Sequence, residues 1–155
     1  MIKEKVGIIG CGWLGYRFAQ YLKDYFEIHS TVTSPGKIKT LTSEGFHPEL
    51  VNFEKTNNDA IGWQPWEKLH LLDHIIITVP LFSRRIDRDR LNARIRNISR
   101  FIAAFNGSLT LMSSVGVYQQ VSGAVTEDML PAKEVEGEKE ITKLFRQVNI
   151  LRLGG

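Results

Sequence analysis

The chain has 155 residues, of which 43% are hydrophobic and 24% charged, and its formal net charge is +3. These values are typical of one globular domain that can bury a core, and they exclude a disordered or fibrous protein. No apolar run approaches the length of about 20 residues that spans a bilayer, and residues 1–5 lead directly into the first strand without a signal peptide, so we expect a cytoplasmic protein with no membrane partner.

The first predicted elements are a short apolar strand at 6–9 and a helix from Trp13 to about Tyr25, joined by a GxGxxG sequence. In this context the first glycine permits a tight turn, the second lets the backbone approach phosphates, and the third lets the helix pack against the sheet. The first amides of the helix lack intrahelical partners and its dipole favours an anion, so a pyrophosphate is the expected ligand. We therefore predict a dinucleotide site at Gly10, Cys11, Gly12, Trp13, Leu14 and Gly15; the alternative is an ordinary tight turn.

The next elements, a strand at 27–33 and a helix at about 37–44, bear on which dinucleotide binds. NAD-specific sites place a carboxylate about 20 residues after the glycines, but this strand ends in hydroxyl residues followed by two lysines. A carboxylate about 4 Å from a 2′-phosphate would cost about 4 kcal/mol per pair of unit charges. We therefore expect NADP, with NAD as the alternative, and the candidates for the phosphate are Thr33, Ser34 and Lys37. The same residues are also typical of a capped turn, in which Ser34 precedes a proline at the first helical position.

The remaining elements continue the alternation of strands and helices. We expect strands at 49–53, 75–79, 109–113 and 148–153, an arginine-rich helix that runs to about residue 105, and a charged helix at about 133–145. This pattern predicts an α/β fold with a doubly wound parallel sheet, strand order 3-2-1-4-5-6 and helices on both faces. Ligands of such sheets bind at the carboxyl ends of the strands, so Val79, Pro80 and Ser113 join the predicted cofactor site. Residues 1–155 are expected to be a single NAD(P)-binding Rossmann domain that is truncated, or lacks its substrate-binding part, after the sixth strand.

The stretch 84–100 carries seven arginines and two aspartates, a net +5, so the rest of the chain has a net −2. Leu91, Ile95, Ile98, Ile102 and Phe105 form one apolar stripe at helical spacing, which places the arginines on the wetter faces of a helix. Arg84 and Arg85 follow a strand end, where they could meet an anionic group. Nucleic-acid binding is disfavoured, because acids interrupt the arginines and no stacking aromatics are interleaved with them.

Six segments together resemble the extended short-chain dehydrogenase/reductase superfamily: VGIIGCGWLG at 6–15, TVTSP at 31–35, IIITVP at 75–80, SSVGVY at 113–118, TEDMLP at 126–131 and NILRLGG at 149–155. Within it, the chain is most similar to the atypical group labelled NAD-dependent epimerase/dehydratase-like, whose members carry similar SSxGVY and LRLxG segments. The resemblance implies that Ser114 polarises a substrate oxygen. It also implies a Tyr and a Lys four residues apart on the next helix, where the lysine would lower the pKa of the phenol.

That pair is missing, because none of the four tyrosines is followed by a lysine at the fourth position and the helix near 133–140 contains no tyrosine. One hypothesis is an atypical NADP(H)-dependent oxidoreductase or epimerase-like enzyme acting on a small carbonyl or sugar-type substrate, with Ser114 as a hydrogen-bond donor. The alternative is a non-catalytic redox sensor or regulatory protein, which the missing pair favours.

The cysteine and histidines add little to the predicted chemistry. The single cysteine, Cys11, cannot form an internal disulfide and is interpreted as a small loop residue. The four histidines are scattered, and His70 and His74 are separated by the start of a strand, so no metal site is predicted. The nicotinamide dinucleotide is the expected partner, the small-molecule substrate is not identified, and a homodimer is left open.

Overall fold

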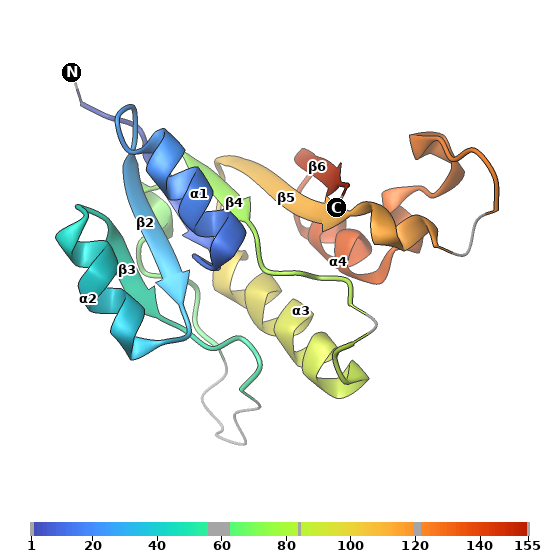
Figure 1. Cartoon of the computed structure of the whole chain (residues 1–155), viewed down its shortest axis with the longest axis horizontal. Helices are drawn as coiled ribbons and strands as arrows, with labels where there is room; N and C mark the ends of the chain where they lie inside the picture. Colours follow the sequence, from blue (N-terminus) through green and yellow to red (C-terminus); the bar gives the residue numbers. More distant parts are fainter. Residues whose placement is uncertain (1, 56–62, 84, 120–121, 155) are drawn as a thin grey trace.

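The computed structural model describes residues 2–55, 63–83, 85–119 and 122–154. Its centre is a sheet of six parallel strands in the order β3-β2-β1-β4-β5-β6 (Figure 1). The strands are β1 (Lys5–Ile9), β2 (Glu27–Val32), β3 (His47–Leu50), β4 (His74–Ile77), β5 (Ser108–Ser114) and β6 (Val148–Leu153). The predicted α/β class and strand order are confirmed.

Four α-helices connect the strands, and short 3-10 turns complete the described chain. The helices are α1 (Trp13–Leu22), α2 (Pro35–Ser43), α3 (Arg88–Ile102) and α4 (Glu136–Leu144). The 3-10 turns are Leu69–Leu71, Val115–Tyr118, Glu127–Met129 and Ala132–Glu134. The last of these turns displaces the start of α4 from the predicted residue 133 to Glu136. Strand β3 also lies earlier than the predicted 49–53, because its register is set by pairing with β2.

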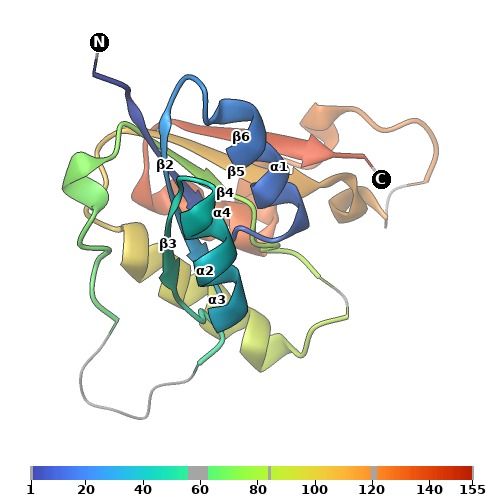
Figure 2. The same ribbon diagram turned by 60° about the vertical axis from the view of Figure 1, so that its left-hand side comes forward.

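Helices cover both faces of the sheet (Figures 1 and 2). A hydrophobic core lies between the helices and the sheet on each face. Successive side chains of β4 point to opposite faces of the sheet. Ile75 and Ile77 belong to the core beneath α3 and α4, whereas Ile76 packs against the core beneath α1 and α2. This double coverage explains the nearly continuous apolar sequence of the central strands. It also leaves the carboxyl ends of the strands as the edge at which polar loops gather.

Helix α3 follows the predicted apolar stripe, with one exception among its arginines. The stripe residues, from Leu91 to Phe105, are all buried against the sheet. Arg94, however, is only 8% exposed, which corrects the prediction that the arginines occupy the wetter faces. Its guanidinium donates to Pro80 O at 2.8 Å and forms an ion pair with Glu54, so burial is tolerated because the charge is paired.

The described part of the chain contains no helix that is both long and apolar enough to cross a membrane. The aromatic rings of Trp63 and Trp66 stack on Phe53 and Phe101 respectively. Of the two arginines predicted to meet an anion, Arg85 is exposed and Arg84 lies outside the described residues.

Candidate functional site

A cleft of about 560 Å³ lies at the carboxyl edge of the sheet. Its volume falls in the range of roughly 300–1,000 Å³ that is usual for small-molecule sites. The glycine loop, the ends of β2 and β4, and the end of β6 form its walls. The lining residues are Gly10, Cys11, Gly12, Trp13, Leu14, Gly15, Thr31, Val32, Thr33, Lys37, Val51, Thr78, Val79, Pro80, Leu153 and Gly154.

Two of the three loop glycines are required by the packing of the loop. Gly10 has a φ of +94°, and a Cβ at this position would lie 2.3 Å from Val79 Cγ2. A Cβ at Gly15 would lie 2.3 Å from Gly10 O, so α1 can approach the loop this closely only with glycine there. Two hydroxyls hold the loop in place: Thr31 Oγ1 accepts from Gly10 N at 2.9 Å, and Thr78 Oγ1 donates to Gly10 O.

Gly12 differs from its two neighbours, because a Cβ built on it would meet no protein atom within 4 Å. It is the N-cap residue of α1, and no side chain caps the helix there or supplies an acid in its first turn. The amides at the start of α1 therefore face the cleft without a protein side chain to accept from them. An uncapped helix N-terminus beside open space is suited to an anionic group.

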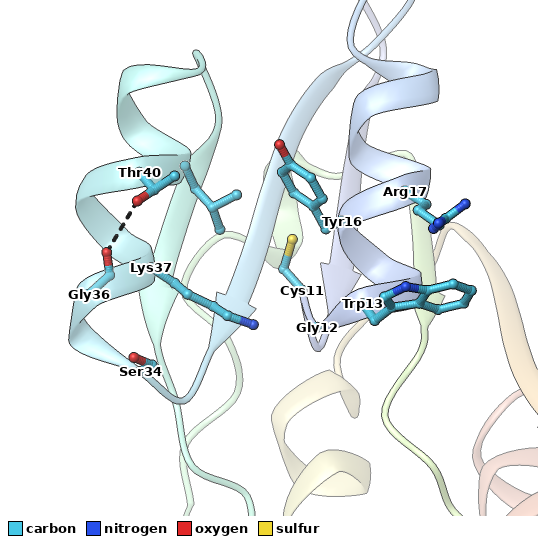
Figure 3. Close-up of a pocket in the computed structure, with 10 residues that line it drawn as sticks. Cys11, Gly12, Trp13, Tyr16, Arg17, Ser34, Gly36, Lys37 and Thr40 are labelled. Carbon is cyan, nitrogen blue, oxygen red and sulfur yellow. Dashed lines mark hydrogen bonds between the residues drawn. The ribbon is translucent and has the colours of Figure 1, made fainter.

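A second hollow of about 750 Å³ adjoins the glycine loop, between α1 and α2. Ser34 occupies the N-cap position of α2 but makes no side-chain cap hydrogen bond, and a proline follows it. Lys37 extends from the first turn of α2 toward the glycine loop, and Tyr16 and Cys11 lie across from it (Figure 3). None of the described residues that line this hollow is acidic. The end of β2 therefore offers hydroxyls and a cation.

Cys11 and Arg17 also line this hollow, and both make contacts within the protein. Cys11 is only 3% exposed, and burial raises the pKa of its thiol, which keeps it protonated and disfavours a role as nucleophile. Arg17 lies 4.3 Å above the ring of Trp13, a residue that is itself 73% exposed. In the sequence, the only sign of that contact is that the two residues are four positions apart on one helix.

The residues at the end of β5 interact with a largely buried network of side chains and do not line the cleft. Ser113 Oγ donates to Glu138 Oε1 at 2.6 Å, and Arg152 makes an ion pair with Glu138 at 2.6 Å. The Tyr118 hydroxyl accepts from Arg152, whose guanidinium also lies 4.8 Å above the Tyr118 ring. The hydrogen bonds to Glu138 raise the pKa of the Arg152 guanidinium further, so this group stays charged. Helix α4 thus presents a paired glutamate on the side where the resemblance implies a tyrosine and a lysine.

Ser114, the predicted catalytic residue, is exposed, and its hydroxyl accepts from Gly116 N at 3.1 Å. A serine at a strand end commonly makes such a local hydrogen bond to the backbone, which is a structural role and needs no ligand. Glu127 and Asp128 lie in an exposed 3-10 turn.

The predicted cofactor residues therefore fall into two groups. The glycine loop, Thr33, Lys37, Val79 and Pro80 line the cleft together, and Ser34 joins Lys37 in the adjoining hollow. The described residues that line the cleft do not include Ser113 or Ser114. Sequence reasoning missed Thr31 and Thr78, although both are polar residues at the ends of buried strands, which is a readable signal.

No protein-family model matches the chain, and no curated protein sequence matches it. Among solved structures, an imine reductase variant from Myxococcus stipitatus in complex with NAD+ is similar at a TM-score of 0.51 and 13% identity, covering 99% of this chain and 41% of that chain. An imine reductase from Bacillus cereus has a TM-score of 0.45 and 14% identity, covering 96% of this chain and 39% of that chain. A reductive aminase from Aspergillus terreus in complex with NADPH has a TM-score of 0.39 and 16% identity, with coverages of 98% and 55%.

The first of these likenesses places the chain in a fold class. The chain has the Rossmann-like α/β fold, and it spans about 41% of the length of the Myxococcus reductase.

Proposed function

We propose that residues 1–155 are a single NAD(P)-binding domain of an oxidoreductase, with the dinucleotide bound in the cleft at the carboxyl edge of the sheet. The observation that carries this proposal is the open space at Gly12, directly in front of the uncapped N-terminus of α1. The pyrophosphate would accept from the first amides of α1, and Val79 and Pro80 would border the cofactor from the end of β4. The similar Myxococcus imine reductase is in complex with NAD+, which agrees with a nicotinamide cofactor.

We further propose that NADP(H) is preferred to NAD(H). A 2′-phosphate at the end of β2 would meet Thr33, Ser34 and Lys37 and no lining carboxylate. The charge-assisted contact with Lys37 would be the strongest of these. NAD remains the alternative cofactor.

Binding is tested with Gly12→Val. Because the added Cβ would enter open space rather than protein, the variant should remain folded and lose no more than the roughly 1 kcal/mol typical of an N-cap substitution. It should nevertheless lose at least tenfold in NADPH affinity by calorimetry, since the side chain would occupy the place of the phosphates. Equal affinity of a folded Gly12→Val variant and the wild type would contradict the proposed site.

The nucleotide preference is tested with Lys37→Ala and the matched control Lys39→Ala, whose residue is exposed on the same helix. A hydrogen bond to a charged group contributes about 1.5–3 kcal/mol. We therefore expect Lys37→Ala to weaken NADPH binding about tenfold or more and to leave NADH binding unchanged. Tighter binding of NADH than NADPH by the wild type would refute the preference.

Chemistry at the site would follow the extended short-chain dehydrogenase/reductase pattern only in part. When bound, the cofactor supplies hydride transfer, and Ser114, whose hydroxyl accepts from Gly116 N, would donate its own proton in a hydrogen bond to a small carbonyl or sugar-type substrate. Turnover of a carbonyl panel by wild type but not by Ser114→Ala would support this atypical enzyme.

A specific observation favours a second candidate function, a non-catalytic NADP(H)-binding sensor or regulatory protein. Ser113 donates its hydroxyl proton to Glu138, and the Tyr118 hydroxyl is paired with Arg152, a residue that does not give up a proton and so does not replace the lysine of the missing pair. Intact NADPH binding without turnover of any substrate in the panel would favour this function over the enzyme.

A further inference from the structure

Three metal-ligating side chains meet at the opposite edge of the sheet from the cleft. Glu27 and His29 are two residues apart on β2 and therefore project from the same face. Parallel pairing places His47 of β3 directly beside His29. One ligand atom from each of the three side chains lies within 4.8 Å of the other two.

The distances within this cluster suit a single ion. His29 Nε2 lies 2.8 Å from Glu27 Oε1, and His47 Nε2 lies 3.9 Å from the same oxygen. Tetrahedral Zn²⁺ with bonds of about 2.0–2.1 Å holds neighbouring ligand atoms roughly 3.3 Å apart. The observed separations lie on either side of that value, so small side-chain rotations bring the atoms to the required spacing.

His29 is suited to be a ligand by its surroundings. The residue is 4% exposed, and its Nε2 lies within hydrogen-bond distance of the Glu27 carboxylate, whereas its Nδ1, the ring nitrogen that would not bind the ion, has no hydrogen-bond partner among the described residues. The imidazole rings of His29 and His47 are stacked at 4.7 Å between centroids, so the two side chains lie side by side.

The charges that face the cluster come from three elements. Lys5 of β1 lies 3.2 Å from Glu27 Oε1, and Lys68 forms an ion pair with Glu49 of β3 at 4.0 Å. The Lys5 ammonium is thus the cation that now neutralises Glu27. Its side chain is 28% exposed and flexible, so a divalent ion can displace it into solvent. His47 is 53% exposed and leaves a path for the ion to enter.

We propose that Glu27, His29 and His47 form a binding site for a borderline divalent cation such as Zn²⁺. Two imidazoles and one carboxylate select zinc over magnesium or calcium, which prefer oxygen ligands. The fourth coordination position faces solvent and takes a water molecule. Since Glu27 and His47 are the first residues of their strands, the ion ties the amino ends of β2 and β3 together and has no contact with the dinucleotide cleft.

The site is tested on the metal-free chain with Zn²⁺ by calorimetry and with Co²⁺ by visible absorption. Zn²⁺ should raise the unfolding temperature, because an ion that binds only the folded state stabilises it. His47→Gln should weaken Zn²⁺ binding at least tenfold, whereas His70→Gln, which changes an exposed histidine outside the cluster, should not. Lys5→Met should tighten binding, since it removes the competing cation.

Several results would overturn the site. These are an absence of Zn²⁺ binding at 100-fold molar excess, equal effects of His47→Gln and His70→Gln, or a thiolate-to-cobalt band showing that Cys11 is the ligand. NADPH affinity should be unchanged by His47→Gln, so a failure of this site is distinguishable from a failure of the dinucleotide site.

Discussion

At the scale of single residues, the loop glycines perform two separable tasks. Gly15 is required by packing, because its Cβ would fall 2.3 Å from the backbone oxygen of Gly10, which cannot move aside as a side chain could. We expect Gly15→Ala to lower the free energy of unfolding by about 1–3 kcal/mol, the usual cost of overpacking. Urea denaturation measures this change.

Gly12→Ala is the matched control, since it adds the same methyl group to the same loop where no atom lies within 4 Å. Its free energy of unfolding should change by less than about 1 kcal/mol, a typical value for an N-cap substitution. Equal destabilisation by both substitutions would show that the loop is not held by contact between α1 and the sheet.

Glu138 is a second residue whose role is visible only in the folded chain. It is 1% exposed, and its carboxylate accepts from both Arg152 and Ser113. Glu138→Gln should destabilise the protein by about 3–5 kcal/mol, because it leaves the mostly buried Arg152 without its counter-charge. Ser113→Ala removes only a hydroxyl and should cost about 1 kcal/mol. Thermal or chemical unfolding that ranks the two variants in reverse would contradict this account.

The residue scale also shows what the sequence could not predict. The GxGxxG motif has a fixed local geometry, so the roles of Gly10 and Gly15 in the turn and in helix packing could be read directly. The hydrogen bond between Ser113 and Glu138 joins residues on different elements. No local sequence pattern predicts which hydroxyl will donate to a buried acid that is distant in the sequence. The same limit applies to His29 and His47, which are brought together only by strand pairing.

At the scale of elements, α3 shows how one arginine can stabilise two loops. Arg94 binds Glu54, which follows β3, and Pro80 O, which follows β4. Asn97, one turn further along, donates to Phe53 O at 2.8 Å. Helix α3 therefore holds the carboxyl ends of two strands that border the cleft.

Arg94→Ala should destabilise the chain by about 1–3 kcal/mol, the cost of leaving partly buried polar groups unpaired. Arg96→Ala, on the exposed face of the same helix, should change the stability by less than about 0.5 kcal/mol. Chemical denaturation of both variants provides the measurement. Similar values would mean that the pairing of Arg94 contributes nothing beyond an ordinary surface arginine.

The elements themselves were largely predictable, because hydrophobic periodicity depends on local spacing alone. The apolar stripe of α3 and the bounds of β6 match the expectation. Element ends were less predictable where tertiary contacts decide them. The burial of Arg94 was missed for a related reason, since an arginine on a helix is expected in solvent unless its partner is known, and Glu54 lies on a different segment.

At the scale of the whole molecule, Glu54 and its partner Arg94, together called the Glu54 clasp, connect the ends of β3 and β4 to α3. Protonation of the Glu54 carboxylate should therefore affect the stability of the entire fold. Hydrogen bonds from Arg94 and Arg90 hold the pKa of the Glu54 carboxyl below its ordinary value. A carboxyl with a lowered pKa stabilises the folded state fully above the pKa of the unfolded chain, about 4.3 for glutamate. This stabilisation is lost as the pH falls from there through the lowered pKa of the folded state.

We therefore expect Glu54→Gln to be less stable than wild type at pH 7, with the difference shrinking as the pH is lowered below about 4. Urea denaturation at pH 7 and pH 3 measures the two differences. Glu136→Gln is the control, because its exposed ion pair with Arg88 contributes little in solvent and should give a small difference at pH 7. A difference between wild type and Glu54→Gln that stays constant across this range would show that the clasp acts through shape rather than charge, and that acid unfolding of the molecule begins elsewhere.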